Sequence, residues 1–385
     1  MTQRPDAGWL PVVTVFSGFF IMGFVDMVGI ATNYIRGDLG LSAIVANLIP
    51  MMVFVWFLLV PIPTGIAVGK VGRRNVVLFA LLVTIIAMLL PYVSYNFYSV
   101  VAGFALLGIG NTILQVTLNP LIASMFGTEK TASILTTGQF IKGLASILGP
   151  VIIAFVVSYF NNWKLIFPVY AILTLLSTAL LLSVKIQENR RDNIAPTFKG
   201  TTMLLGRAPM RYCFFCVFLV VGFDVGINIL MPEILVRHGG ILLADAGIGT
   251  GIYFTAKTAG AFIGALILMK VKAFRYLLFT LCVAVVSYLL LIWVHNPIVI
   301  YALIFITSFA CANVFSIVFS FALKAFPAKS NEVSALMIMA ITGGALIPVI
   351  QGWVNDQWGF SQSLLVVLGC LLIMLFLTLK MRRYV

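Results

Sequence analysis

Two acidic residues lie inside long apolar segments of this chain. Asp26 falls in the run GFFIMGFVDMVGI, and Asp224 falls in the run VVGFDVG of the second half. A carboxylate at the centre of a bilayer costs on the order of 3 kcal/mol on insertion scales, so such residues face a water-filled path or a partner. Two acids at matching places in two halves predict a duplicated membrane transporter with a central polar route. Both are candidate proton-coupling groups.

Two lysines, Lys142 and Lys257, also lie inside apolar segments. Two lysines and two acids could neutralise one another as buried ion pairs. Alternatively, a lysine could face the polar route and bind the carboxylate of a sugar acid, such as a sialic acid or a uronate. The residues alone leave both interpretations open.

Amide side chains are the other polar feature of the apolar segments. Asn111, Gln115 and Asn119 recur every four residues and therefore share one helix face. Sugar hydroxyls donate and accept hydrogen bonds, so a sugar site favours amides together with an aromatic face. The alternative is hydrogen bonding between helices, worth about 0.6 kcal/mol on average. The candidate substrate-binding residues are Gln115, Asn119, Gln139, Lys142, Asn228, Lys257, Asn313 and Trp56.

The composition indicates that most of the chain is surrounded by lipid. Of 385 residues, 62% are hydrophobic and 9% are charged, and the mean hydropathy is +1.13. Long apolar runs exclude a porin-type barrel, whose strands alternate and span only about ten residues. The first apolar segment is long enough to span the membrane, so we expect no secretory signal peptide.

Twelve apolar runs predict an all-α membrane protein with twelve transmembrane helices. Each run is near or above the roughly 20 residues that cross a bilayer. We expect an N-terminal six-helix half at 1–185, a cytoplasmic linker at 186–211 and a C-terminal half at 212–385. The predicted helices are 9–35, 43–69, 76–94, 97–126, 131–159, 163–185, 212–236, 247–269, 276–294, 297–325, 333–354 and 361–379.

The basic residues predict the orientation of these helices. With a cytoplasmic N-terminus, nineteen of the 24 Lys and Arg lie on the cytoplasmic side, while Arg36, Lys164 and Arg237 lie outside. This bias places both termini in the cytoplasm, in a cytoplasmic (inner) membrane. The net charge of +13 then reflects topology and anionic lipid headgroups, and no nucleic-acid partner is needed.

The two halves of the chain show an internal repeat. Residues 69–81 align with 269–281, and GPVI at 149–152 is echoed by IPVI at 347–350. Parallel repeats of six helices are typical of transporters that bind substrate between the halves, near the bilayer midplane.

The loop between the second and third predicted helices carries a family motif. GIAVGKVGRR at 65–74 resembles the Gly-x-x-x-Asp-Lys/Arg-x-Gly-Arg/Lys-Arg/Lys motif of the major facilitator superfamily. Gly69 stands where the motif has its acid. The resemblance implies two six-helix bundles in the major facilitator fold, with helices one, four, seven and ten lining the central cavity.

Shorter segments are similar to the fucose–proton symporter and glucose/galactose transporter family. They are LNP at 118–120, GQF at 138–140, GFDV at 222–225 and GGALIP at 343–348. Gln115 stands where fucose-type members have a Glu, and Lys142 where an Asn is usual. The resemblance implies import of a monosaccharide with a proton.

We therefore expect a monomeric secondary active transporter that works by alternating access. Its partners would be a sugar, a coupling ion and the lipid bilayer. The coupling ion would be a proton, with sodium as the alternative. Alternatives are a transporter of an anionic sugar acid and a multidrug/proton antiporter. No nucleophile motif, metal-ligand cluster or cofactor motif supports an enzyme, so we expect no catalytic residues, cofactor or metal.

Overall fold

The computed structural model describes residues 9–41, 43–46, 48–126, 130–184, 197–241 and 247–384, which contain helices and no β-strand. Within them, eleven helices are long and apolar enough to cross a membrane, and a bent pair makes a twelfth span. The twelve predicted spans are thereby confirmed. The described chain forms two compact units. Unit 1 comprises residues 1–128, 141–201 and 328–338, and unit 2 comprises 129–140, 202–327 and 339–385.

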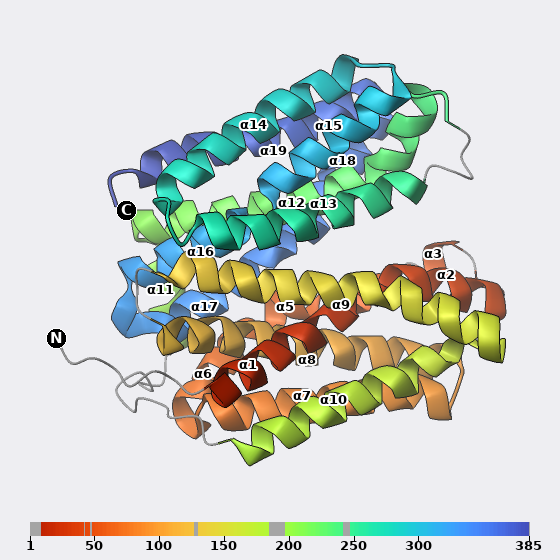
Figure 1. The fold of residues 1–385 in the computed structure, drawn as a ribbon, viewed down its shortest axis with the longest axis vertical. Coiled ribbons are helices and arrows are strands. Elements are labelled where there is room, and N and C mark those ends of the chain that lie inside the picture. The colour runs from red at the N-terminus through yellow and green to blue at the C-terminus, as the bar shows by residue number, and fades with distance from the viewer. Residues whose placement is uncertain are drawn as a thin grey trace. The chain divides into compact units, whose positions relative to one another are not determined.

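Unit 1 is a bundle in which α7 packs against α8 and α10, and α1 packs on α8 and α10 (Figure 1). Its helices are α1 Trp9–Met22, η1 Gly23–Met27, α2 Val28–Asp38, α3 Ala43–Ala46, α4 Leu48–Phe54, α5 Trp56–Leu59, α6 Pro61–Val71, α7 Arg73–Val93, α8 Phe97–Met125, most of α9 Thr131–Phe160, η3 Trp163–Leu165, α10 Ile166–Ser183 and α17 Ser330–Met339.

Helix α17 belongs to unit 1 although it lies late in the chain. The Ser334 hydroxyl donates to the Val116 carbonyl at 2.6 Å. The Arg73 guanidinium donates to Ser330 Oγ at 2.8 Å and to Asn331 Oδ1 at 3.1 Å. The basic loop motif read from the sequence therefore makes specific contacts with neutral acceptors.

The first span is interrupted by a 3₁₀ turn, η1, which carries Asp26. The second span bends by 55° between Leu48–Leu59 and Pro61–Val71. Pro61 begins α6, and its ring removes a backbone donor and clashes with the preceding turn, which accounts for the bend.

Unit 2 contains α12 Ala208–Arg237, which packs against α18 and α19, while α15 packs against α13 and α14. Its other helices are α13 Gly247–Ile267, α14 Ala273–Trp293, α15 Pro297–Cys311, α16 Val314–Ala325, η7 Ala340–Thr342, α18 Gly343–Trp358 and α19 Phe360–Met381. The colours from green to blue in Figure 1 mark most of this unit.

Glycines allow close helix crossings at corresponding places in the two units. A Cβ on Gly23 would lie 2.5 Å from the Lys142 carbonyl oxygen of α9. A Cβ on Gly222 of α12 would overlap the side chain of Ile347 of α18. The first span therefore crosses the fifth, α9, and the seventh span, α12, crosses the eleventh, which contains α18. These equivalent crossings agree with the internal repeat.

The predicted linker, 186–211, is partly helical. Residues 185–196 lie outside the described part. The short helix α11, Phe198–Leu204, and the start of α12 at Ala208 fall within the predicted linker. The seventh span therefore begins earlier than the apolar run indicated. Arg207 immediately precedes α12, and Arg211 breaks the apolar pattern within its first turn without ending the helix.

Candidate functional site

The Asp26 side chain is exposed at the helix break of the first span. Ser146 of α9 donates its hydroxyl to Asp26 Oδ2 at 2.5 Å, and the same hydroxyl contacts the Lys142 carbonyl at 3.1 Å. An exposed carboxylate in the middle of a span is costly in lipid, which favours a position that faces a hydrated path.

A chain of amides supports the same helix break. Asn111 Nδ2 donates to the carbonyl of Met22, the last residue of α1, at 2.7 Å. Gln115 Nε2 donates to Asn111 Oδ1 at 2.7 Å, and Asn119 Nδ2 donates to the Gln115 carbonyl at 2.7 Å. All three side chains are buried. The predicted stripe therefore exists. Asn111 joins α8 to α1 as the alternative interpretation describes, while the contacts of Gln115 and Asn119 lie within α8.

The remaining predicted residues of the first half lie on two other elements. Trp56 begins α5 with its ring beside Gly108, and its buried Nε1 has no acceptor among the described residues. Gln139 and Lys142 lie on α9 and are partly buried. Trp56 thus retains an unused hydrogen-bond donor.

Unit 2 holds a second polar cluster around Asp224 of α12. Tyr253 donates its hydroxyl to Asp224 Oδ1, and Lys257 binds Asp224 Oδ2. The side chains of Lys257 and Asp224 are 31% and 17% exposed, and that of Tyr253 is buried. Both carboxylate oxygens are therefore occupied, and the charges of Asp224 and Lys257 compensate each other.

Asn228 and Asn313 differ in their surroundings. Asn228 Nδ2 donates to the Asp224 carbonyl at 2.7 Å, and its buried Oδ1 has no donor among the described residues. Asn313 is fully buried, and its Nδ2 donates to the Gly260 carbonyl at 2.9 Å and to the Tyr276 hydroxyl at 3.1 Å. Asn313 therefore joins three helices of unit 2.

Comparison with known proteins identifies the family. The family model of the Major Facilitator Superfamily matches residues 14–223, more than half of the chain. The chain belongs to the Major Facilitator Superfamily. It is accordingly a multi-pass membrane protein of a transporter family.

Individual members of the superfamily match almost the whole chain. A glucose/galactose transporter of Brucella abortus (strain 9-941) is 24% identical over 369 residues, covering 91% of this chain and 89% of its own length. The sialic acid transporter NanX of Escherichia coli K12 is 25% identical, covering 94% and 89%. The structure of the Escherichia coli fucose:proton symporter FucP has a TM-score of 0.86 at 16% identity, covering 96% and 98%. This last match confirms the predicted major facilitator fold.

Sequence reasoning missed the direct partners of the two acids, Ser146 and Tyr253. Each lies four residues from an intramembrane lysine, Ser146 after Lys142 and Tyr253 before Lys257. Residues four apart share a helix face. A search of the lysine-bearing faces for hydroxyl groups would have found both partners.

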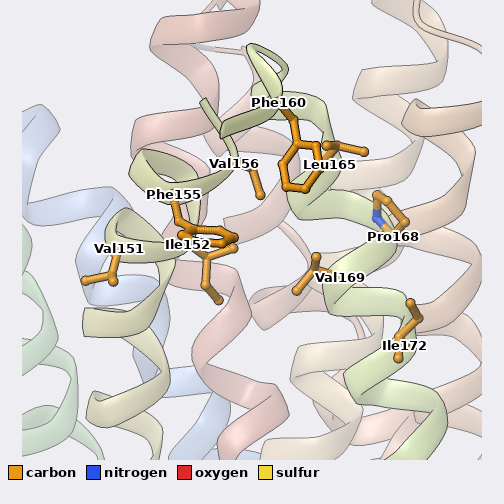
Figure 2. Close-up of a pocket in the computed structure, with 9 residues that line it drawn as sticks. All are labelled: Val151, Ile152, Phe155, Val156, Phe160, Leu165, Pro168, Val169 and Ile172. Atoms are coloured by element: carbon orange, nitrogen blue, oxygen red, sulfur yellow. The ribbon is translucent and has the colours of Figure 1, made fainter. Parts of the chain in front are cut away.

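A hollow of about 670 Å³ lies between α9 and the η3–α10 segment (Figure 2). Its lining is entirely apolar and consists of Val151, Ile152, Phe155, Val156, Phe160, Leu165, Pro168, Val169 and Ile172. A sugar would lose hydrogen bonds to water there without gaining replacements, so the hollow does not fit a sugar site. Its lining suits lipid chains.

Proposed function

We propose that this protein imports a monosaccharide together with a proton, by alternating access, across a cytoplasmic membrane with both termini in the cytoplasm. Membership of the superfamily and the similarity to a glucose/galactose transporter support the substrate class. The similarity to the fucose:proton symporter FucP supports the coupling ion. The excess of Lys and Arg in the predicted cytoplasmic loops supports the orientation.

The exposed Asp26 carboxylate carries the proposal. It lies on a 3₁₀ turn and is held by the Ser146 hydroxyl. A hydroxyl can donate to the carboxylate, and after protonation it can accept from the acid, so the contact survives both states. Asp26 is therefore the group to which we assign the coupled proton.

Asp224 has a different role in this proposal. Its two oxygens are engaged by Tyr253 and Lys257, so a proton on Asp224 would leave a lysine charge uncompensated. We assign Asp224 and Lys257 to a neutral pair that stabilises unit 2. The residues assigned to sugar contacts are Gln115, Gln139, Asn228 and Trp56. The Asn228 Oδ1 and Trp56 Nε1 atoms have no hydrogen-bond partner among the described residues.

Uptake by proteoliposomes tests the proposal. Purified protein would be reconstituted and offered radiolabelled glucose, galactose, fucose and sugar acids, with the outside more acidic than the lumen by one pH unit. Accumulation of any of these sugars, abolished by a protonophore, is the expected result. Sugar uptake that stops at equilibrium with or without the gradient would refute proton coupling. A lumenal pH that falls as a hydrophobic dye leaves the lumen, with no sugar uptake, would support the multidrug antiporter.

A further inference from the structure

The two intramembrane lysines have different surroundings. Lys257 is bound to Asp224. Lys142 is partly buried, and within the described part of the chain no carboxylate oxygen lies within 4.0 Å of its ammonium group. Lys142 is therefore an intramembrane cation without an acidic partner among the described residues.

An unpaired ammonium in a span is as costly as an unpaired carboxylate, on the order of 3 kcal/mol on insertion scales. Intramembrane charges of this kind face hydrated paths or bind a ligand. The Lys142 backbone carbonyl faces Gly23 and accepts a hydrogen bond from the Ser146 hydroxyl. The charge of Lys142 is thus available to a partner that is not part of the described chain.

The position of Lys142 places this charge beside the proposed proton site. Lys142 and Ser146 are one turn apart on the same face of α9, and Ser146 binds Asp26. Lys142 therefore lies one helical turn from the residue that binds Asp26, and no ion pair joins Lys142 to Asp26 in the described part of the chain. A site of this kind offers a positive charge, a hydroxyl and a titratable acid to one ligand.

We propose that the transported sugar carries a carboxylate, as a sialic or uronic acid does, and that Lys142 is its counter-charge. The inference rests on the proposed function and narrows its substrate class. Lysine binds a carboxylate as a point charge through up to three donors, while the sugar hydroxyls contact amides. Lys257 takes no part in this contact, because Asp224 already neutralises it.

An anionic substrate determines the net charge that crosses the membrane in one transport cycle. One substrate anion and one proton on Asp26 cross together, and Lys142 stays charged throughout. Net charge movement is zero, so a pH gradient drives uptake and a membrane potential does not. A neutral sugar with one proton would instead carry one positive charge and would respond to the potential.

The experiment is counterflow and driven uptake in proteoliposomes. The probes are N-acetylneuraminate and galacturonate beside glucose, galactose and fucose. The variants are Lys142→Gln and Lys142→Arg, with Lys270→Gln as a matched control, because Lys270 is an exposed lysine in the turn that follows α13. Thermal stability in detergent and size-exclusion profiles establish that each variant is folded.

We expect the wild-type protein and Lys270→Gln to exchange a sugar acid and not the neutral sugars. Lys142→Gln should raise KM for the acid at least about tenfold, and Lys142→Arg should raise it less. Uptake should respond to a pH gradient and not to a potassium diffusion potential. The selectivity and the driving force of the wild-type protein test the inference even where Lys142→Gln does not fold.

Two results would overturn the inference in distinguishable ways. Exchange of neutral sugars, stimulated by the membrane potential and equally reduced for every sugar by Lys142→Gln, would contradict it while the proposed function stands. Folded wild-type protein that exchanges neither class of sugar would overturn the inference and the proposed function together.

Discussion

The ion pair of Asp224 and Lys257 allows a quantitative test of its proposed stabilising role. Replacing one member, by Asp224→Asn or Lys257→Gln, leaves the other charge uncompensated. Breaking a buried ion pair costs about 3–5 kcal/mol. Because the two side chains are 17% and 31% exposed, we expect the lower end, about 3 kcal/mol for each single variant.

The double variant Asp224→Asn with Lys257→Gln removes both charges and keeps polar groups that can hydrogen-bond. Neutral replacement of a buried pair is often close to neutral in stability, so we expect a free energy of unfolding within about 1 kcal/mol of wild type. Independent effects would instead add to about 6 kcal/mol. The double-mutant cycle therefore separates the two possibilities by several kcal/mol.

The assay is thermal unfolding in detergent, followed by the fluorescence of a thiol-reactive dye, with proton-driven uptake measured in parallel. For a chain of 385 residues that unfolds as one unit, a loss of about 3 kcal/mol corresponds to an apparent Tm lower by about 4 °C. We expect each single variant to show this loss and the double variant to recover both Tm and uptake. A double variant less stable than either single variant would contradict the pairing.

Three further predictions concern local contacts. Gly343→Ala should destabilise the protein by about 3 kcal/mol, because its Cβ would overlap the backbone oxygen of Phe218 in α12. Gly352→Ala on the same helix meets nothing within 4 Å among the described residues and should be tolerated in the same thermal assay. Asn111→Ala should lower the free energy of unfolding by about 1–3 kcal/mol, because it leaves the Met22 carbonyl at the end of α1 without its hydrogen bond. A variant as stable as wild type in the thermal assay would show that this carbonyl needs no partner. Burial, followed by the charges of His295 and Arg237, lowers the pKa of His238 below 6.5. The contribution of His238 to the free energy of unfolding is therefore complete above pH 6.5 and is lost as the pH falls below that value. The Tm of the wild-type protein should drop between pH 7.5 and 5.5 and that of His295→Gln should drop less, whereas equal drops would contradict this assignment.

Hydropathy alone was sufficient for the number of spans, because lipid requires long apolar helices with internally satisfied backbones. The places where the spans break could be predicted only in part. Pro61 marks the bend of the second span in the sequence. The 3₁₀ turn at Gly23–Met27 has no such local signal, since the Asn111 side chain from α8 binds the carbonyl that precedes it.

The polar residues show a similar limit. Their types and positions were readable as a set of intramembrane charges and amides, but their pairing depends on which helices meet. The sequence allowed Lys257 to form an ion pair or to bind substrate. Its contact with Asp224 arises from the packing of α12 against α13. The amides at every fourth residue were interpreted as a cavity lining, but Asn111 and Asn119 bind backbone carbonyls. The sequence could not separate these cases, because a polar stripe has the same spacing whether it faces a cavity or another helix.

Proton-driven accumulation by Asp26→Asn is the most direct test of the central claim. In wild-type proteoliposomes, one coupled proton and a gradient of one pH unit support up to about tenfold accumulation of the transported sugar. Asp26→Asn should lower this ratio to about one and keep sugar exchange in counterflow, while Asp38→Asn, an acid at the end of the same span, should accumulate like wild type. Accumulation by Asp26→Asn at the wild-type level would contradict the assignment of the coupled proton to Asp26.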